Sequence, residues 1–479
     1  MNPQPWREAL PWRDPEAVVW SVVQSHGAHG LVWLDGDGSD LGRWGRLGFA
    51  PRLSRVCRGL PGQPISTDPF QVLAELETEL MGRAAPLSWM GWLGYEAGAW
   101  VEPAPHWKPP DQAVLWAAGF DHELVFDLQA GQLWLEGCSP GAQRHALAAQ
   151  LQAQIAALPA PPQHGDDVGE FELGRLNPGG LDPEGLTPEE WLPITGWHWH
   201  TDRAGFARQV EQIRAWIAAG DLFQANLTSC CEAALPAALA NRSDGAAAVA
   251  LYSRLRRHCP APFAALAVGC GAAAGEAVLC SSPERFLRRE PDGRVQTRPI
   301  KGTRPRHSDP QADGLAAAEL VCSPKDRAEN VMIVDLLRND LGRVCQAGSI
   351  QVPQLVGLES YRQVHHLTSV VEGQLPAHLG LADLLRACWP GGSISGAPKI
   401  RACQRLAELE PVPRGPYCGS LFRLGRDGSF DSNILIRSLM LQGQTLRAHA
   451  GCGIVADSDP QGEADEMGWK IEPLLRALA

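Results

Sequence analysis

The sequence predicts an α+β fold built on antiparallel sheets. Short runs rich in β-forming residues occur at 262–268, 433–441 and 446–450, and the spacing between them is too uneven for a repeating βαβ unit. The chain has 479 residues, of which 44% are apolar, so it can bury a large core. The sequence shows no repeat of solenoid or propeller period.

The chain divides into three predicted regions. An N-terminal region, 1–156, alternates short apolar runs with turns and ends in a helix near 141–157 that is rich in Ala, Leu and Gln. Residues 157–195 are rich in Pro, Gly and acidic residues, which is typical of a linker or a long excursion. The remainder, 196–479, is the predicted catalytic domain. The weakly charged run at 261–280 is interrupted by glycines, so we expect buried strands there and no membrane span.

The charge balance argues against nucleic acid as a partner. Forty-two Lys and Arg stand against 54 Asp and Glu, a formal charge of −12, whereas phosphate binding needs clustered positive charge. A small-molecule substrate fits this balance better. The N-terminus has no apolar signal region and the 13 cysteines form no CxxC pair, so we expect reduced thiols and a cytoplasmic protein.

Two segments predict helices that carry carboxylates on one face. In the first, Ser323 is a plausible N-cap, and Asp326 and Glu329 lie three residues apart. In the second, near the C-terminus, Glu463, Glu466 and Lys470 share a face. If the two faces converge, their negative charge requires a cation, and carboxylate oxygens suit Mg2+. Spacing alone also allows both faces to be solvated.

Two glycine-rich turns and one lysine suggest ligand chemistry. The turn at 390–399 resembles a phosphate loop, but Ala397, Pro398 and Lys399 replace the required Lys-Ser/Thr, so a nucleotide site is disfavoured. This turn and the one around Gly453 can offer backbone amides to a carboxylate. Lys301 stands among arginines, where positive charge and burial favour a neutral, nucleophilic amine. A salt-bridged surface lysine is the alternative.

Together these segments resemble the chorismate-utilising enzymes over essentially the whole chain, most densely from 205 to 473. The matching motifs lie at 220–227, 282–286, 298–304, 325–330, 364–367, 390–399, 434–437 and 450–470. The resemblance implies an α+β fold in which antiparallel sheets form a two-layer core and helices pack outside. It also implies that Glu329 and Glu466 bind Mg2+ directly and that Asp326 and Glu463 hold its waters.

The resemblance further assigns the substrate pocket. The residues that it implies for binding chorismate are Thr303, Ser393, Tyr417, Arg437, Gly453 and Lys470, with His366 completing the pocket around the ring. Chorismate is a dicarboxylate, so an acidic protein needs local cations to hold it.

Within the family, the residue after Pro-Ile separates the activities. Members that form anthranilate carry Ala there, whereas members that aminate chorismate at C4 carry the lysine found here as Lys301. The resemblance then implies that Lys301 adds to C2 while Glu284, as general acid, protonates the departing C4 hydroxyl. Gln224 stands where water-activating members have a lysine. An anthranilate-forming enzyme is the alternative within the family, and an inactive chorismate-binding regulatory paralogue is the alternative outside catalysis.

Ammonia for this reaction is expected from glutamine. No Gly-x-Cys-x-Gly nucleophile elbow surrounds any of the 13 cysteines, so the sequence implies a separate glutamine amidotransferase subunit. The family often lines a tryptophan pocket with a serine in its N-terminal region. The segment at 33–36, Trp-Leu-Asp-Gly, lacks that serine, so we do not expect tryptophan binding.

Overall fold

The computed structural model describes residues 6–82, 87–138, 141–160, 193–242, 245–361 and 364–479. Their strands form two sheets in which neighbouring strands run antiparallel. Among the described residues, no helix combines the length and the apolar character that a membrane crossing requires.

The larger sheet, sheet A, has twelve strands. In spatial order they are β1 (Trp6–Leu10), β8 (Gln132–Gly137), β7 (His122–Asp127), β3 (Trp44–Gly48), β2 (Val32–Leu34), β11 (Phe263–Val268), β12 (Glu276–Ser282), β21 (Ser438–Gln442), β22 (Thr445–Ile454), β10 (Gln224–Ala234) and β18 (Gly396–Ala397), with β9 (His198–Trp199) paired to β10.

The smaller sheet, sheet B, has ten strands. In spatial order they are β15 (Ile300–Pro305), β17 (Val364–Gln374), β14 (Arg294–Arg298), β13 (Arg285–Arg289), β20 (Phe430–Asn433), β19 (Ser420–Leu424), β5 (Ser88–Leu93), β6 (Leu115–Phe120) and β4 (Leu53–Cys57), with β16 (Gln351–Ser360) paired to β17.

The two sheets pack face to face around a shared apolar layer. Trp92 of β5 and Trp116 of β6 stack with ring centroids 4.8 Å apart, and both side chains are fully buried. They belong to one cluster with Val32 of β2 and Val278 of β12, which come from sheet A. Burial of such large side chains is the main source of stability in a layered core. The predicted two-layer α+β fold is therefore confirmed.

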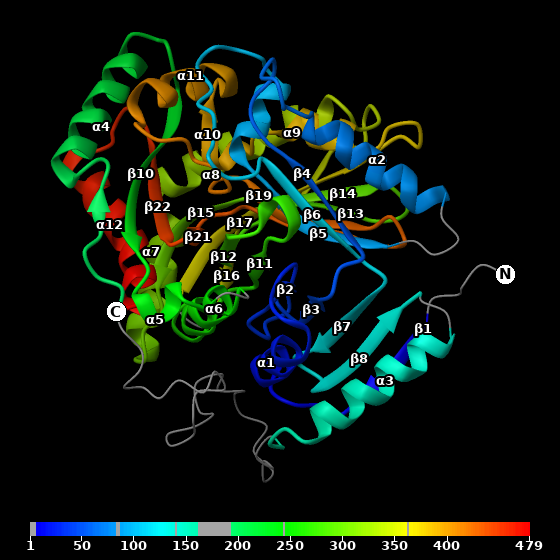
Figure 1. The fold of residues 1–479 in the computed structure, drawn as a ribbon. Helices are drawn as coiled ribbons and strands as arrows, with labels where there is room; N and C mark the ends of the chain where they lie inside the picture. Colours follow the sequence, from blue (N-terminus) through cyan, green and yellow to red (C-terminus); the bar gives the residue numbers. More distant parts are fainter. Residues whose placement is uncertain (1–5, 83–86, 139–140, 161–192, 243–244, 362–363) are drawn as a thin grey trace.

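Helices cover the outer faces (Figure 1). They are α1 (Pro15–His26), α2 (Pro69–Gly82), α3 (Gly141–Ala156), α4 (Arg203–Ala218), α5 (Ala237–Ala240), α6 (Ala246–His258), α7 (Pro310–Cys322), α8 (Pro324–Gly342), α9 (Leu381–Cys388), α10 (Gly392–Ser395), α11 (Lys399–Leu409) and α12 (Pro460–Ala477), with 3-10 turns η1 (Tyr95–Trp100) and η2 (Gly271–Ala273). Helices α4, α6 and α12 pack on sheet A, whereas α7 and α8 pack on sheet B.

Most of the predicted elements are confirmed. The helix near 141–157 is α3, the run at 261–280 is β11 and β12 joined by η2, and the run at 446–450 lies in β22. The prediction of a single strand at 433–441 is wrong. It is divided between the end of β20 and β21, and Arg437, which lies between the two strands, has a left-handed backbone with φ of 50° that departs from extended geometry.

Strands from the N-terminal region and from the later region share both sheets. In sheet A, Leu34 of β2 pairs with Ala265 of β11, and in sheet B, Trp92 of β5 pairs with Leu421 of β19. The predicted boundaries at 156 and 196 remain predictions, and most of the predicted linker, 161–192, lies outside the described residues.

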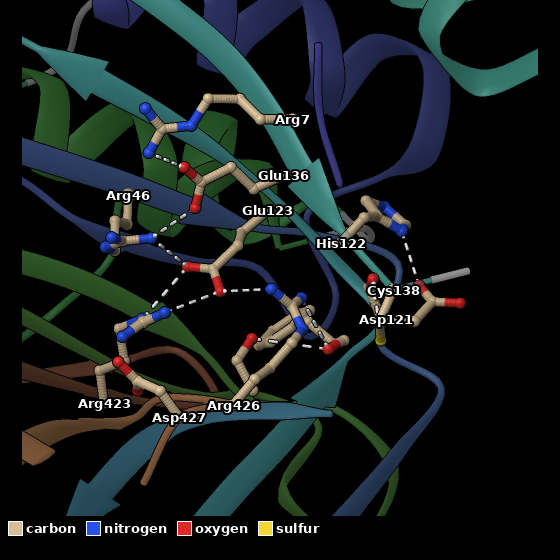
Figure 2. A network of polar contacts seen from close by, with 12 residues as sticks. Arg7, Arg46, Asp121, His122, Glu123, Glu136, Cys138, Arg423, Arg426 and Asp427 are labelled. Atoms are coloured by element: carbon tan, nitrogen blue, oxygen red, sulfur yellow. Dashed lines mark hydrogen bonds and ion pairs between the residues drawn. The ribbon is translucent and has the colours of Figure 1, made fainter. Parts of the chain in front are cut away.

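A buried ion cluster also joins the sheets (Figure 2). Glu123 of β7 is completely buried and accepts hydrogen bonds from Arg46 of β3 at 3.0 Å and from Arg423 of β19 at 3.0 and 3.1 Å. Arg426, in the turn after β19, adds a fourth at 3.2 Å. The three guanidinium groups outweigh the desolvation of the carboxylate and hold the pKa of Glu123 well below its usual range.

Candidate functional site

Helices α8 and α12 bring carboxylates together. Helix α8 begins where the sequence predicts, since the hydroxyl of Ser323 accepts the amide of Asp326 at 3.2 Å. Asp459 caps the N-terminus of helix α12, and its side chain accepts the amide of Gly462 at 2.6 Å. Lys325 of α8 lies 3.5 Å from Glu463 of α12. The two acidic faces therefore converge.

The carboxylates of this cluster are not saturated by protein partners. The carboxylate of Glu329 makes no hydrogen bond or ion pair with any residue that the structure describes, and burial raises its pKa. Oxygen atoms of Glu463 and Glu466 and the sulfur of Cys452 lie within 4.8 Å of one another. Glu463 also accepts the hydroxyl of Ser458 at 2.7 Å. Concentrated, partly buried negative charge of this kind favours a bound cation.

The donor set fits a hard divalent cation such as Mg2+. Carboxylate oxygens are its preferred protein ligands. Burial and the nearby carboxylates raise the pKa of Cys452 to about 12, and its sulfur lies 3.4 Å from the main-chain carbonyl of Glu463. Lys470 lies beside the same group, since its amine is 2.7 Å from Glu466 and donates to the carbonyl of Gly451 at 3.0 Å.

Glu284 and Lys301 lie close enough to interact electrostatically. Glu284 follows β12 and is almost completely buried, and burial raises its pKa to about 7, although a hydrogen bond from Ser393 and the charge of Lys301 oppose the rise. The amine of Lys301 makes no ion pair within the described chain. The alternative of a salt-bridged lysine therefore does not match the structure.

The arginines expected to surround Lys301 are themselves paired. Arg298 donates to Glu359 at 2.5 Å, and Arg304 contacts Asp326 at 3.4 Å and Glu319 at 3.0 Å. Their positive charge is thus largely compensated by neighbouring carboxylates. The charged groups that interact with Lys301 itself include the carboxyl groups of Glu284 and Glu329.

Gly453 brings the main chain directly against two predicted site residues. A Cβ atom at this position would lie 2.5 Å from the amide nitrogen of Gln224 and 3.3 Å from the amine of Lys301. A side chain at this position would displace the end of the Gln224 side chain and crowd the Lys301 amine. The amide oxygen of Gln224 is buried and has no hydrogen-bond partner among the described residues, which leaves it available to a ligand.

His366 and Arg437 offer unpaired nitrogen atoms. His366 Nδ1 is 2.9 Å from the hydroxyl of Thr303, while its buried Nε2 has no partner among the described residues. Burial and the charge of Arg437 lower the pKa of His366 to about 3, so the ring is neutral. The guanidinium of Arg437 makes no hydrogen bond or ion pair within the described part of the chain, and desolvation lowers its pKa. A desolvated, unpaired arginine fits an anionic ligand.

Tyr417 is buried and stacks on His449 with ring centroids 4.8 Å apart. Beneath it lies a pair that sequence reasoning missed, Glu410 and Arg414, which are joined at 2.6 Å. Their only sequence signal is the i,i+4 spacing, which many surface pairs share. The roles predicted for the site residues remain predictions, but the structure gathers the acidic cluster with Lys470, and it places Glu284, Lys301, Gln224 and Gly453 together.

Comparison with known proteins places these motifs in context. The model of a family described as "chorismate binding enzyme" matches residues 53–476. Aminodeoxychorismate synthase component 1 from Klebsiella aerogenes is 45% identical over 285 residues, 59% of this chain and 60% of that protein. Aminodeoxychorismate synthase from Streptomyces pristinaespiralis is 36% identical over 486 residues, 98% of this chain and 61% of that protein. The chain thus spans about three fifths of these relatives.

Other relatives carry different names. Anthranilate synthase component 1 from Streptomyces coelicolor is 35% identical over 443 residues, 88% of this chain and 79% of that protein. The crystal structure of anthranilate synthase component I from Streptococcus pneumoniae has 28% identity and a TM-score of 0.69, covering 91% of this chain and 92% of that one. The isochorismate synthase MenF from Escherichia coli, with 19% identity, a TM-score of 0.70 and coverage of 99% and 94%, shares the fold.

Proposed function

Because this chain belongs to the family of chorismate binding enzymes, we propose that it converts chorismate and ammonia to 4-amino-4-deoxychorismate, the precursor of p-aminobenzoate in folate synthesis. The observation that carries the proposal is Lys301, at the position that separates this branch from the anthranilate-forming branch. Two relatives named for this activity support it, one of them aligned with 98% of the chain.

Substrate binding follows from the unpaired groups of the site. Arg437 is a desolvated cation with no partner among the described residues, so it suits a chorismate carboxylate. His366, Thr303, Ser393, Tyr417 and the main chain at Gly453 would surround the ring, and Lys470 would add positive charge beside the acidic cluster.

The acidic cluster would hold Mg2+ through Glu329 and Glu466, with Asp326 and Glu463 holding its waters. Bound Mg2+ would neutralise the ring carboxylate and withdraw electron density as a bond forms at C2. The absence of protein partners around Glu329 in the described chain supports this assignment.

Chemistry would proceed by two displacements. The neutral amine of Lys301 forms a bond to C2, the double bond shifts, and the C4 hydroxyl departs as water after accepting the proton of Glu284. The raised pKa of Glu284, about 7, keeps a proton available near neutral pH. Ammonia then bonds to C4, the double bond shifts back, and the lysine amine leaves C2. Gln224, a neutral amide, gives no base for activating water.

A glutamine amidotransferase subunit would supply the ammonia. The name "component 1" carried by the Klebsiella aerogenes relative supports a two-component enzyme. The predicted cytoplasmic location remains a prediction. An inactive paralogue is disfavoured, because Glu284, Lys301, Glu329, Arg437 and Glu466 are all present.

Product identification tests the proposal. The purified chain with chorismate, Mg2+ and an ammonium salt should form 4-amino-4-deoxychorismate without releasing pyruvate. Glutamine in place of ammonium should give no product until a separate amidotransferase is added. Anthranilate with stoichiometric pyruvate would instead assign the chain to the other branch.

A further inference from the structure

The Arg414 side chain makes an unusually complete set of buried contacts. It is 3% exposed, and its guanidinium donates to both carboxylate oxygens of Glu410 at 2.9 and 2.6 Å, to the carbonyl of Ile394 at 2.8 Å and to the carbonyl of Asn226 at 2.7 Å. Glu410 also accepts the backbone amide of Thr228 at 3.0 Å. Glu410 raises the pKa of Arg414 well above its usual range, so the charge is permanent.

These contacts join three segments that each carry a predicted site residue. Asn226 lies two residues after Gln224 on β10, and Ile394 directly follows Ser393 in α10. The main chain of Arg414 itself accepts the amide of Tyr417 at 3.2 Å. None of the hydrogen bonds of the Arg414 side chain reaches Lys301 or Glu284, so any effect on the chemistry must pass through the groups that Arg414 holds.

We propose that Arg414, fixed by Glu410, is a positioning residue that locks Gln224, Ser393 and Tyr417 into one rigid arrangement around the substrate. The proposal rests on the proposed function of that site. Arginine is required because a planar fork can donate to a carboxylate and to two carbonyls at once, whereas a lysine amine reaches fewer of them. A displacement of about 1 Å at a reacting centre costs on the order of 100-fold in rate.

Loss of the Arg414 contacts should change the pH dependence of activity, which a simple loss of stability would not do. Ser393 donates a hydrogen bond to Glu284, and this bond lowers the pKa of Glu284 against the effect of burial. If Arg414 no longer holds Ile394, Ser393 should move and that bond should weaken. The alkaline limb of the pH profile, which reports the acid form of Glu284, should then move to higher pH.

The test compares Arg414→Lys with a matched control, Arg256→Lys. Arg256 is also buried, at 7% exposed, and is held by Asp35 at 2.7 Å and Glu16 at 3.2 Å, neither of which is a predicted site residue. We expect similar thermal destabilisation of both variants. Only Arg414→Lys should lose on the order of 10- to 100-fold in kcat and shift its alkaline limb upward by about half a pH unit or more.

Glu410→Gln provides a milder second variant, because it retains one acceptor oxygen. It should shift the limb in the same direction by less. The proposal would be overturned if a folded Arg414→Lys protein had the wild-type kcat and an unshifted alkaline limb. It would also be overturned if Arg414→Lys and Arg256→Lys lost equal activity, or if neither Arg414→Lys nor Glu410→Gln folded. The proposed function is tested separately, because it depends only on which product the wild-type protein forms. Chorismate binding by the variants, measured by calorimetry, tests the role of Arg414 whatever that product is.

Discussion

Glu284 is a carboxyl group on which burial and hydrogen bonding act in opposite directions. Burial raises its pKa to about 7, and a general acid must be protonated to act. The protonated fraction therefore falls as pH rises through about 7. We expect kcat/KM to decline above this pH. The Glu284→Gln variant should lose most of its activity, and its remaining activity should no longer decline above pH 7. A pH–rate profile checks the prediction, and a profile that stays flat to pH 9 would remove Glu284 from the acid role.

Lys301 should form a covalent link to the substrate. In the absence of ammonia, intact-protein mass spectrometry of quenched reactions should show the enzyme plus chorismate less one water. Lys301→Ala should lose the adduct and most 4-amino-4-deoxychorismate, and the space it opens at C2 should shift residual product towards anthranilate-type chemistry. Lys301→Arg should also fail, because a guanidinium does not readily deprotonate.

Near-normal output from Lys301→Ala, together with no adduct in the wild type, would show that Lys301 is only an electrostatic neighbour. The structure adds one constraint to this experiment. A Cβ atom at Gly453 would lie 3.3 Å from the Lys301 amine and 2.5 Å from the side-chain nitrogen of Gln224, so Gly453→Ala should displace these groups and reduce turnover while keeping the lysine itself.

At the scale of elements, the acidic faces of helices α8 and α12 together form the predicted Mg2+ site. Glu329→Gln or Glu466→Gln each removes an anionic oxygen and no core volume, so the fold should persist while Mg2+ affinity falls on the order of 100-fold. Calorimetric titration with Mg2+ and circular dichroism measure the two effects separately. Asp335→Asn, an exposed change on the same helix α8, is the control. Unchanged Mg2+ affinity in either glutamine variant would exclude that residue as a ligand.

Local signals explain which elements the sequence could predict. Ser323 followed by Pro324 marks a helix start through cap chemistry, which depends only on neighbouring residues. The division of the run at 433–441 was missed because nothing in its apolar pattern reports the left-handed backbone of Arg437. A tertiary fold can impose such a conformation against local preference.

The site shows the same limit. Spacing predicted each acidic face, but the convergence of α8 and α12 depends on sheet packing that spacing does not encode. Arg414 was missed because the carbonyls of Asn226 and Ile394 that it binds lie 188 and 20 residues away in the chain. The apparent arginine neighbours of Lys301 are near in sequence, yet they are occupied by Glu359 and Asp326.

At the scale of the molecule, the Glu123 cluster links the two sheets. Glu123→Gln would leave Arg46, Arg423 and Arg426 partly uncompensated in a buried setting, so we expect a loss of about 3 to 5 kcal/mol of unfolding free energy by urea titration. The depressed pKa of Glu123 means that its contribution is present above the unfolded pKa of about 4.5 and is lost as pH falls further.

The variant should therefore differ most from wild type near pH 7 and converge with it under acid conditions. A constant difference between the two proteins from pH 7 to pH 3 would contradict this assignment. Because the cluster is remote from Lys301 in the sheets, the kcat of the folded variant should remain close to that of wild type.

The shared sheets also determine the order in which the chain can fold. Leu34 can pair early with Arg46 and Trp92 with Trp116, but the second partners of these strands, Ala265 and Leu421, are synthesised much later. Until then, their unpaired edges and apolar faces are open to other chains. Synthesis of this protein therefore passes through a long period of exposure, and its yield should depend on chaperones more than its final stability suggests.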